Sequence, residues 1–232
     1  MKFELCAASI EAIQLAKELN FDRIELCQNL EQGGLTPSFS LIEYAIAYGI
    51  STHVLIRPRP GGFTYNSDEL ELIIREVVNC KNMGAAGIVI GVLNENGTID
   101  EPILEEIMKK SVGLEVTFHR AFDDCVEWKK AIDILVKHGV KRILSSGLAR
   151  NVDIGYPVLT EMIKYADGRI EIMTGGGVNA ANIGRLVTEL TPDAIHFSGT
   201  AKVQLDEESL FSESILKVDA NKVKRILSAA SA

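Results

Sequence analysis

The chain has 232 residues, of which 47% are hydrophobic and 24% are charged, and its 24 basic and 32 acidic side chains give a formal charge of −8. This composition excludes a low-complexity disordered chain, and the acidic balance argues against broad electrostatic capture of nucleic acid or of an anionic membrane. The length is sufficient for a substantial core, and we predict a single domain over residues 1–232.

The compartment is indicated by the N-terminus and by the cysteines. Glu4 interrupts the apolar region that a signal peptide would need, and no apolar run approaches membrane-spanning length. The four cysteines, Cys6, Cys27, Cys80 and Cys125, are far apart in the chain and form no CxxC pair. This pattern predicts a cytoplasmic protein with reduced thiols.

Short β-rich segments alternate with amphipathic helical segments, which is typical of βα units that build a parallel sheet. We predict eight strands, over residues 3–7, 23–27, 52–57, 87–92, 114–119, 142–146, 169–174 and 194–198. A helical pattern follows the first of them, with Ile10, Ile13 and Ala16 spaced as on one helix face behind an N-cap at Ser9. A unit of about 27 residues fits one strand, one helix and two short loops, so we predict a (β/α)8 TIM barrel, with a doubly wound open sheet as the alternative.

The segment 201–218 lacks this periodicity. Its acidic residues and serines predict an irregular surface excursion, and a final helix is expected to begin near Asp219.

Alternate residues of a strand point to opposite faces, and in several predicted strands the polar residues share one face. In the fifth strand, for example, Val116 and Phe118 oppose Thr117. If the apolar faces meet the helices, the barrel interior receives ten ionisable side chains: Glu4, Cys6, Glu25, Cys27, His53, Arg57, Glu115, His119, Glu171 and His196. A compensated salt-bridge network that holds the barrel is one reading of this set, particularly for the three glutamates Glu4, Glu115 and Glu171.

Side chains at the carboxyl ends of the strands carry more functional weight, because the active sites of this fold gather there. Arg57 and Arg59 end the third strand and suit bidentate binding of a carboxylate or phosphate, although a surface ion-pair cluster would use the same residues. His119 and Asp123 follow the fifth strand and suit general acid–base chemistry, with Glu25 as a second proton-transfer group. A structural His–Asp pair is the alternative.

Two further loops have a composition that suits an anion. Gly175, Gly176 and Gly177 follow the seventh strand, and His196 and Ser198 end the eighth. Backbone amides at these two places often bind phosphate in this fold, so we predict that these residues contribute to a ligand site; a tight turn alone would also explain the glycines.

Cys6 and Cys27 occupy corresponding positions on adjacent predicted strands, with the same inward parity. Two soft thiolates that approach each other suit Cu(I) better than Mg²⁺ or Ca²⁺. Two buried free cysteines without a ligand are the alternative.

Several motifs resemble, in order, those of the CutC family of copper homeostasis proteins. They are residues 4–6 (ELC), 23–27 (RIELC), 33–38 (GGLTPS), 56–59 (IRPR), 117–123 (TFHRAFD), 146–147 (SG), 175–177 (GGG) and 196–198 (HFS). The resemblance covers about the first 200 residues and implies a cytoplasmic TIM barrel that handles copper, with Cu(I) bound by Cys6 and Cys27. The departures are Pro60 in the loop after Arg59 and a tail, residues 201–232, without a matching motif.

Three functions follow as hypotheses. The first is a cytosolic copper homeostasis protein that captures Cu(I) at Cys6 and Cys27 inside the barrel. The alternative is an enzyme that acts on a small anionic or phosphorylated metabolite at the carboxyl-terminal face. A third is a module that binds another protein and uses its ionic interior for stability alone. We expect copper or a small anion as partner, no nucleic acid and no membrane, and each hypothesis is compatible with a homo-oligomer.

Overall fold

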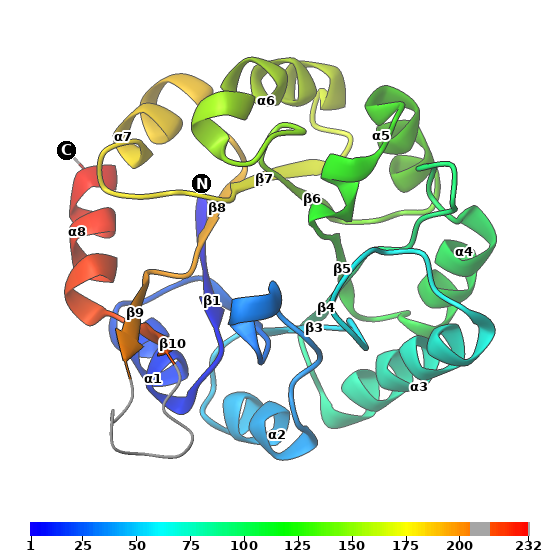
Figure 1. Ribbon diagram of the computed structural model, residues 1–232, viewed down its shortest axis with the longest axis horizontal. Helices are drawn as coiled ribbons and strands as arrows, with labels where there is room; N and C mark the ends of the chain where they lie inside the picture. Colours follow the sequence, from blue (N-terminus) through cyan, green and yellow to red (C-terminus); the bar gives the residue numbers. More distant parts are fainter. Residues whose placement is uncertain (205–213, 232) are drawn as a thin grey trace.

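Eight parallel strands close into a barrel in the computed structural model, which describes residues 1–204 and 214–231. Each strand pairs with the next, and β8 pairs with β1, so the TIM barrel is confirmed and the open sheet is excluded (Figure 1). The strands are β1 (Lys2–Ala7), β2 (Arg23–Leu26), β3 (Thr52–Leu55), β4 (Gly87–Ile90), β5 (Glu115–Phe118), β6 (Arg142–Ser145), β7 (Glu171–Gly175) and β8 (Ala194–Phe197).

Helices form a ring around the barrel (Figure 1). They are α1 (Ile10–Glu18), α2 (Phe39–Ala47), α3 (Ser67–Met83), α4 (Glu101–Lys110), α5 (Trp128–Lys137), α6 (Val152–Ala166), α7 (Ile183–Arg185) and α8 (Ala220–Ala230), with short 3-10 turns η1 (Leu30–Gln32) and η2 (Arg120–Asp124) and a π-turn η3 (Leu186–Leu190). Caps fix where several begin: the Ser9 side chain accepts a hydrogen bond from the Ala12 amide, as predicted for α1. None of the helices in the described part of the chain is long and apolar enough to cross a membrane.

The predicted strands all overlap observed ones but extend one or two residues too far at several ends. The third was predicted to residue 57 and ends at Leu55, and the fifth was predicted to residue 119 and ends at Phe118. Arg57 and His119 therefore lie in the loops that follow their strands, at the carboxyl-terminal mouth of the barrel.

The barrel interior holds buried ion pairs. Arg142 at the start of β6 is fully buried and donates hydrogen bonds to Glu115 and Glu171, each at 2.8 Å, and to the Thr117 hydroxyl at 3.1 Å. On the other side Glu4 is paired with Arg23. The predicted salt-bridge network of the three inward glutamates, Glu4, Glu115 and Glu171, is thus confirmed. Their positive partners are Arg23 and Arg142, which were not expected to point inward.

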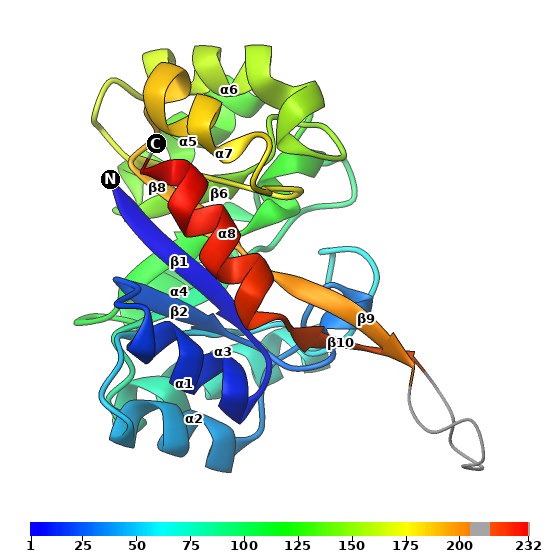
Figure 2. The same ribbon diagram turned by 90° about the vertical axis from the view of Figure 1, so that its left-hand side faces the viewer.

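The segment before the last helix differs from the prediction. Residues 200–204 and 214–218 form an antiparallel pair, β9 (Thr200–Gln204) and β10 (Ser214–Val218), which projects from the barrel (Figure 2). The prediction of an irregular excursion over 201–218 is therefore wrong for its first and last residues. These two segments lack a periodic pattern of polar residues, but hydrogen bonds between them form the strand pair. The rest of the predicted excursion, 205–213, lies outside the described residues. Helix α8 follows its N-cap, Asp219, as predicted.

Candidate functional site

A cavity of about 630 Å³ lies at the carboxyl-terminal mouth of the barrel. Its walls include six of the residues predicted to form a site: Cys6, Glu25, Arg57, His119, Asp123 and His196. They come from strands or loops that are distant in the sequence and adjacent around the barrel, which is the arrangement expected of a TIM-barrel site.

Cys6 and Cys27 meet as predicted from their strand parity. Their sulfur atoms lie 3.7 Å apart, and the residues are 5% and 0% exposed. The Cys6 thiol also donates to the Glu25 carboxylate at 3.7 Å. The hydrogen bond with Cys27 and burial raise the pKa of Cys6, so Cys6 rests as a thiol.

His196 and two glutamates lie beside this pair. His196 Nδ1 is 2.7 Å from a Glu4 oxygen, and the other Glu4 oxygen accepts from Arg23. Burial alone would raise the pKa of Glu4, but the hydrogen bond from His196 and the positive charge of Arg23 hold it below its usual range. Burial raises the pKa of Glu25, and one Glu25 oxygen, Oε2, is buried without a hydrogen-bond partner.

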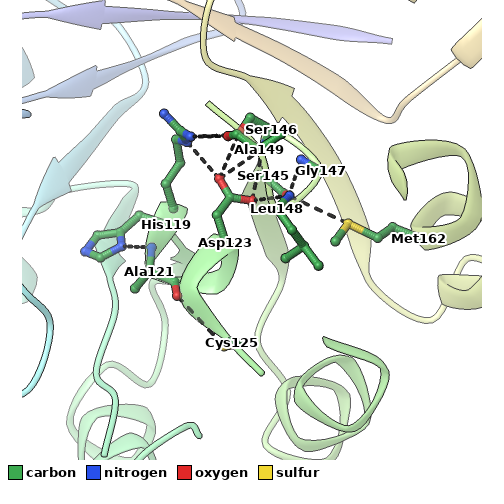
Figure 3. Close-up of polar contacts among 11 residues, drawn as sticks. His119, Ala121, Asp123, Cys125, Ser145, Ser146, Gly147, Leu148, Ala149 and Met162 are labelled. Atoms are coloured by element: carbon green, nitrogen blue, oxygen red, sulfur yellow. Dashed lines mark hydrogen bonds and ion pairs between the residues drawn. The ribbon is translucent and has the colours of Figure 1, made fainter. Parts of the chain in front are cut away.

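His119 presents a hydrogen-bond donor to its surroundings. Its Nδ1 accepts from the Ala121 amide at 3.0 Å, so the neutral ring carries its proton on Nε2, which is buried and has no partner in the described structure. Burial and the charge of Arg57 lower the pKa of His119 to about 3, which keeps the ring neutral near pH 7. The ring points away from Asp123, so the structural His–Asp pair considered as the alternative is not formed (Figure 3).

Asp123 is instead an anchor for the loop after β6 (Figure 3). Its carboxylate accepts from Arg120 at 2.8 Å, from the Ser145 hydroxyl at 2.6 Å, from the Ser146 hydroxyl at 2.9 Å and from the Leu148 amide at 3.2 Å. With its oxygens taken in this way, the carboxylate orients the loop rather than presenting a free proton acceptor. Ser145 has no role among the predicted site residues, because a serine at a strand end carries no specific signal.

The two predicted anion-binding arginines lie in different environments. Arg57 is buried and donates to the carbonyl oxygens of Gln32, Gly34 and Gly61 at 3.0, 2.9 and 2.8 Å. Its Nε has no partner, and no carboxylate pairs with it among the described residues. Arg59 is 37% exposed, pairs with Glu69 and is not part of the cavity wall, which matches the surface ion-pair alternative.

The glycine-rich loop after β7 and Ser198 lie outside the cavity wall. Gly175 leaves no room for a side chain, because a Cβ there would be 2.7 Å from Leu144. Gly176 and Gly177 have φ values of +100° and +83°, which favour glycine, and the Ser198 hydroxyl contacts Thr200. Turn geometry therefore accounts for the two positive-φ glycines, and ligand binding by these four residues stays a prediction.

The sequence matches the CutC family over residues 1–201. A CutC family protein of Glaesserella parasuis is 38% identical over 237 residues, which cover 98% of each chain. A CutC family protein of Bacteroides thetaiotaomicron is 40% identical over 207 residues, which cover 88% of this chain and 83% of that protein.

Solved structures show the same relationship. The crystal structure of a candidate copper homeostasis protein, CutC of Streptococcus agalactiae, aligns with a TM-score of 0.80 at 35% identity and covers 84% of this chain and 98% of that one. Deoxyribose phosphate aldolase of Aeropyrum pernix aligns with a TM-score of 0.61 at 15% identity over 85% of each chain, a likeness that shows the shared fold alone.

Proposed function

Because this chain belongs to the CutC family, we propose that it is a copper homeostasis protein that binds Cu(I) through Cys6 and Cys27. The observation that carries the proposal is the buried pair of sulfur atoms 3.7 Å apart. Thiolates are soft ligands and favour Cu(I), which accepts them in preference to the hard oxygen ligands of Mg²⁺ and Ca²⁺.

The surroundings of the pair support a soft ion. Leu55 and Val89 form one buried apolar cluster with the two cysteines. A hard cation loses its hydration water reluctantly and is therefore disfavoured in such a place, whereas Cu(I) bound by sulfur needs no water ligands. Cys6 lines the cavity and Cys27 lies behind it, so an ion arriving through the mouth meets Cys6 first.

We place this function in the cytoplasm. The four cysteines are free thiols in the structure, and Cu(I) binding by thiolates requires that they stay reduced.

An anaerobic Cu(I) titration against a competing chelator tests the proposal. Wild type is expected to take up one equivalent tightly, and the Cys6→Ser/Cys27→Ser double variant to lose affinity by about a hundredfold or more, because no second soft ligand remains. Cys80→Ala and Cys125→Ala remove cysteines that are equally buried elsewhere, and both are expected to bind as wild type does. Equal competition by the wild type and the double variant would contradict the cysteine site.

A second candidate function is an enzyme that acts on a small anionic metabolite in the same cavity. The observation that favours it is Arg57, a buried guanidinium that is neutralised by no carboxylate of the described chain. An anion in the cavity would supply the missing charge and would also accept from His119 Nε2. We propose Glu25 as the proton-transfer group, because its Oε2 is unpartnered whereas the Asp123 carboxylate is already occupied.

Oxalate and inorganic phosphate, measured by calorimetry, serve as probes of this candidate. His119→Leu is expected to weaken oxalate binding by about tenfold, the worth of one hydrogen bond to a charged group, while His119→Gln retains a donor and binds as wild type. Because the pKa of His119 is about 3, the ring stays neutral and its contribution is expected to be constant between about pH 5 and pH 8.

A histidine of ordinary pKa would gain charge as the pH falls, and binding would tighten. Such tightening below about pH 6.5 that disappears in His119→Gln would therefore contradict the neutral donor. Binding of neither probe would contradict the anionic substrate, and binding of phosphate alone would favour a phosphorylated one.

A further inference from the structure

A second set of metal-binding atoms lies at the base of the cavity, on three adjacent strands. Cys6, Glu25 and His196 belong to β1, β2 and β8, and the barrel register places Cys6 opposite Glu25. One sulfur, one carboxylate oxygen and one imidazole nitrogen, all buried or nearly so, lie within 4.8 Å of one another. In the described ranges, no other trio of His, Cys, Asp or Glu meets this condition.

His196 is held in the orientation that a metal ligand needs. Its Nδ1 is 2.7 Å from a Glu4 oxygen, and Glu4 is itself fully buried and fixed by Arg23. A hydrogen bond from Nδ1–H to this carboxylate leaves the lone pair on Nε2. Histidines that bind metals characteristically donate their other ring proton to a carboxylate in this way, which sets the tautomer and the ring orientation.

The incomplete hydrogen bonding of the Glu25 carboxylate is an independent observation in favour of a bound cation. Its side chain is buried, and Oε1 receives only the weak thiol hydrogen bond of Cys6, at 3.7 Å. Oε2 has no hydrogen-bond partner in the described structure. A buried carboxylate oxygen without a hydrogen-bond partner is rare in native proteins and requires an explanation. A cation bound between Glu25, Cys6 and His196 would give this oxygen a partner.

We propose that Cys6, Glu25 and His196 bind one zinc ion, with the fourth coordination position open to the cavity. Sulfur, nitrogen and oxygen donors together are the ligand types of zinc, and three protein ligands with an open position are the arrangement of catalytic zinc sites. With bonds of about 2.0–2.3 Å, tetrahedral donors lie roughly 3.3–3.8 Å apart. Cys6 Sγ and Glu25 Oε1, the other oxygen of the same carboxylate, are already separated by 3.7 Å.

The charges of the cluster agree with a divalent ion. A Cys6 thiolate, Glu4 and Glu25 bring three negative charges, and Arg23 together with a divalent cation brings three positive ones, so the buried group is neutral when the ion is bound. The open position faces the same cavity as Arg57 and His119. A small anionic ligand could then bind the ion through one of its oxygens. The ion would act as a Lewis acid and polarise that ligand.

This inference goes beyond copper binding and rests on a different donor set. Cu(I) is assigned to Cys6 with Cys27, and zinc to Cys6 with Glu25 and His196, so the two ions compete for one sulfur. Variants of Cys27 and of His196 therefore separate the two sites.

Cobalt(II), a spectroscopic substitute for zinc, tests the assignment on the purified protein after removal of metal by a chelator. We expect one equivalent of Co²⁺ to give tetrahedral ligand-field bands and a sulfur-to-cobalt charge-transfer band, and added Zn²⁺ to displace both. Cys27→Ser is expected to keep these bands. His196→Gln and Glu25→Gln are each expected to weaken Zn²⁺ affinity by about a hundredfold, and His196→Gln is expected to leave Cu(I) affinity unchanged.

The variants are compared only after circular dichroism shows that they are folded, and the isosteric Glu25→Gln serves if His196→Gln does not fold. Absence of the charge-transfer band in wild type overturns the zinc site. Loss of the band in Cys27→Ser with its retention in both Glu25→Gln and His196→Gln also overturns it, because the ion would then belong to the cysteine pair. Failure of Cu(I) binding in wild type with retention of the cobalt bands overturns the copper proposal alone.

Discussion

Replacing Arg142 with methionine is expected to lower the free energy of unfolding by about 3 kcal/mol, because it leaves two carboxylates without their shared partner. Arg142 is 0% exposed and bridges Glu115 and Glu171 at 2.8 Å each. Breaking a fully buried pair costs about 3–5 kcal/mol, and we expect the lower end because Glu115 is 43% exposed and regains water.

Urea unfolding followed by the fluorescence of the single tryptophan, Trp128, measures this change. Arg169→Met is the matched control: it removes an exposed ion pair with Asp133, and a much smaller loss than that of Arg142→Met is expected. Equal losses in the two variants would show that burial adds nothing to the Arg142 pairs.

The pH dependence of the Arg142 effect has a definite sign. Burial alone would raise the pKa of Glu115, but the hydrogen bond and charge of Arg142 outweigh it and hold the pKa below its ordinary value of 4.5. A carboxylate with a lowered pKa in the folded state stabilises the protein above pH 4.5 and loses that contribution as the pH falls. The difference between wild type and Arg142→Met is therefore expected to be largest near neutral pH and to shrink in acid.

Gly155→Ala is expected to destabilise the protein by about 3 kcal/mol, although the same change in an ordinary helix interior stabilises by about 1 kcal/mol. A Cβ at Gly155 in α6 would lie 1.8 Å from the carbonyl oxygen of Ser146, and Gly147 packs against the same turn of α6. The obstacle is backbone, which does not rotate aside as a side chain does. The shift would also move Ser146, whose amide and hydroxyl are bound by Asp123.

Thermal and urea unfolding of Gly155→Ala, with Gly62→Ala as the control, test this contact. A Cβ at Gly62 meets nothing within 4 Å, so a change within about 0.5 kcal/mol is expected there. A Gly155→Ala protein as stable as wild type would mean that α6 and the loop after β6 are not packed so closely.

Strand parity explains both the successes and the omissions in the predicted interior. Glu4, Glu25 and His196 alternate with large apolar residues, so their inward direction can be read along a single strand. Arg142 shares its face with Leu144, which packs inside the barrel with Met173, and this mixture of charge and apolar surface hides the alternation. Because Arg142 is the first residue of its strand, its sequence position suggests an exposed strand end and not a side chain that points inward.

The barrel and the faces of its strands follow from local sequence patterns, because βα spacing and period-two alternation can each be read within one unit. Strand parity also predicts that Cys6 and Cys27 face the barrel interior from adjacent strands, although the register pairs Cys6 with Glu25 and Cys27 lies two residues further along the chain.

The role of each polar side chain at the mouth depends on contacts between residues that lie on different elements of the fold. His119 uses Nδ1 to bind Ala121, and Asp123 is taken up by the loop after β6, although the two are close in the chain. Glu4 and His196 are 192 residues apart and meet because β8 closes on β1. Closure of the barrel joins the two ends of the chain, and the hydrogen-bond partners that this creates, rather than the residue types, decide which nitrogen, oxygen or sulfur atoms remain free for a ligand.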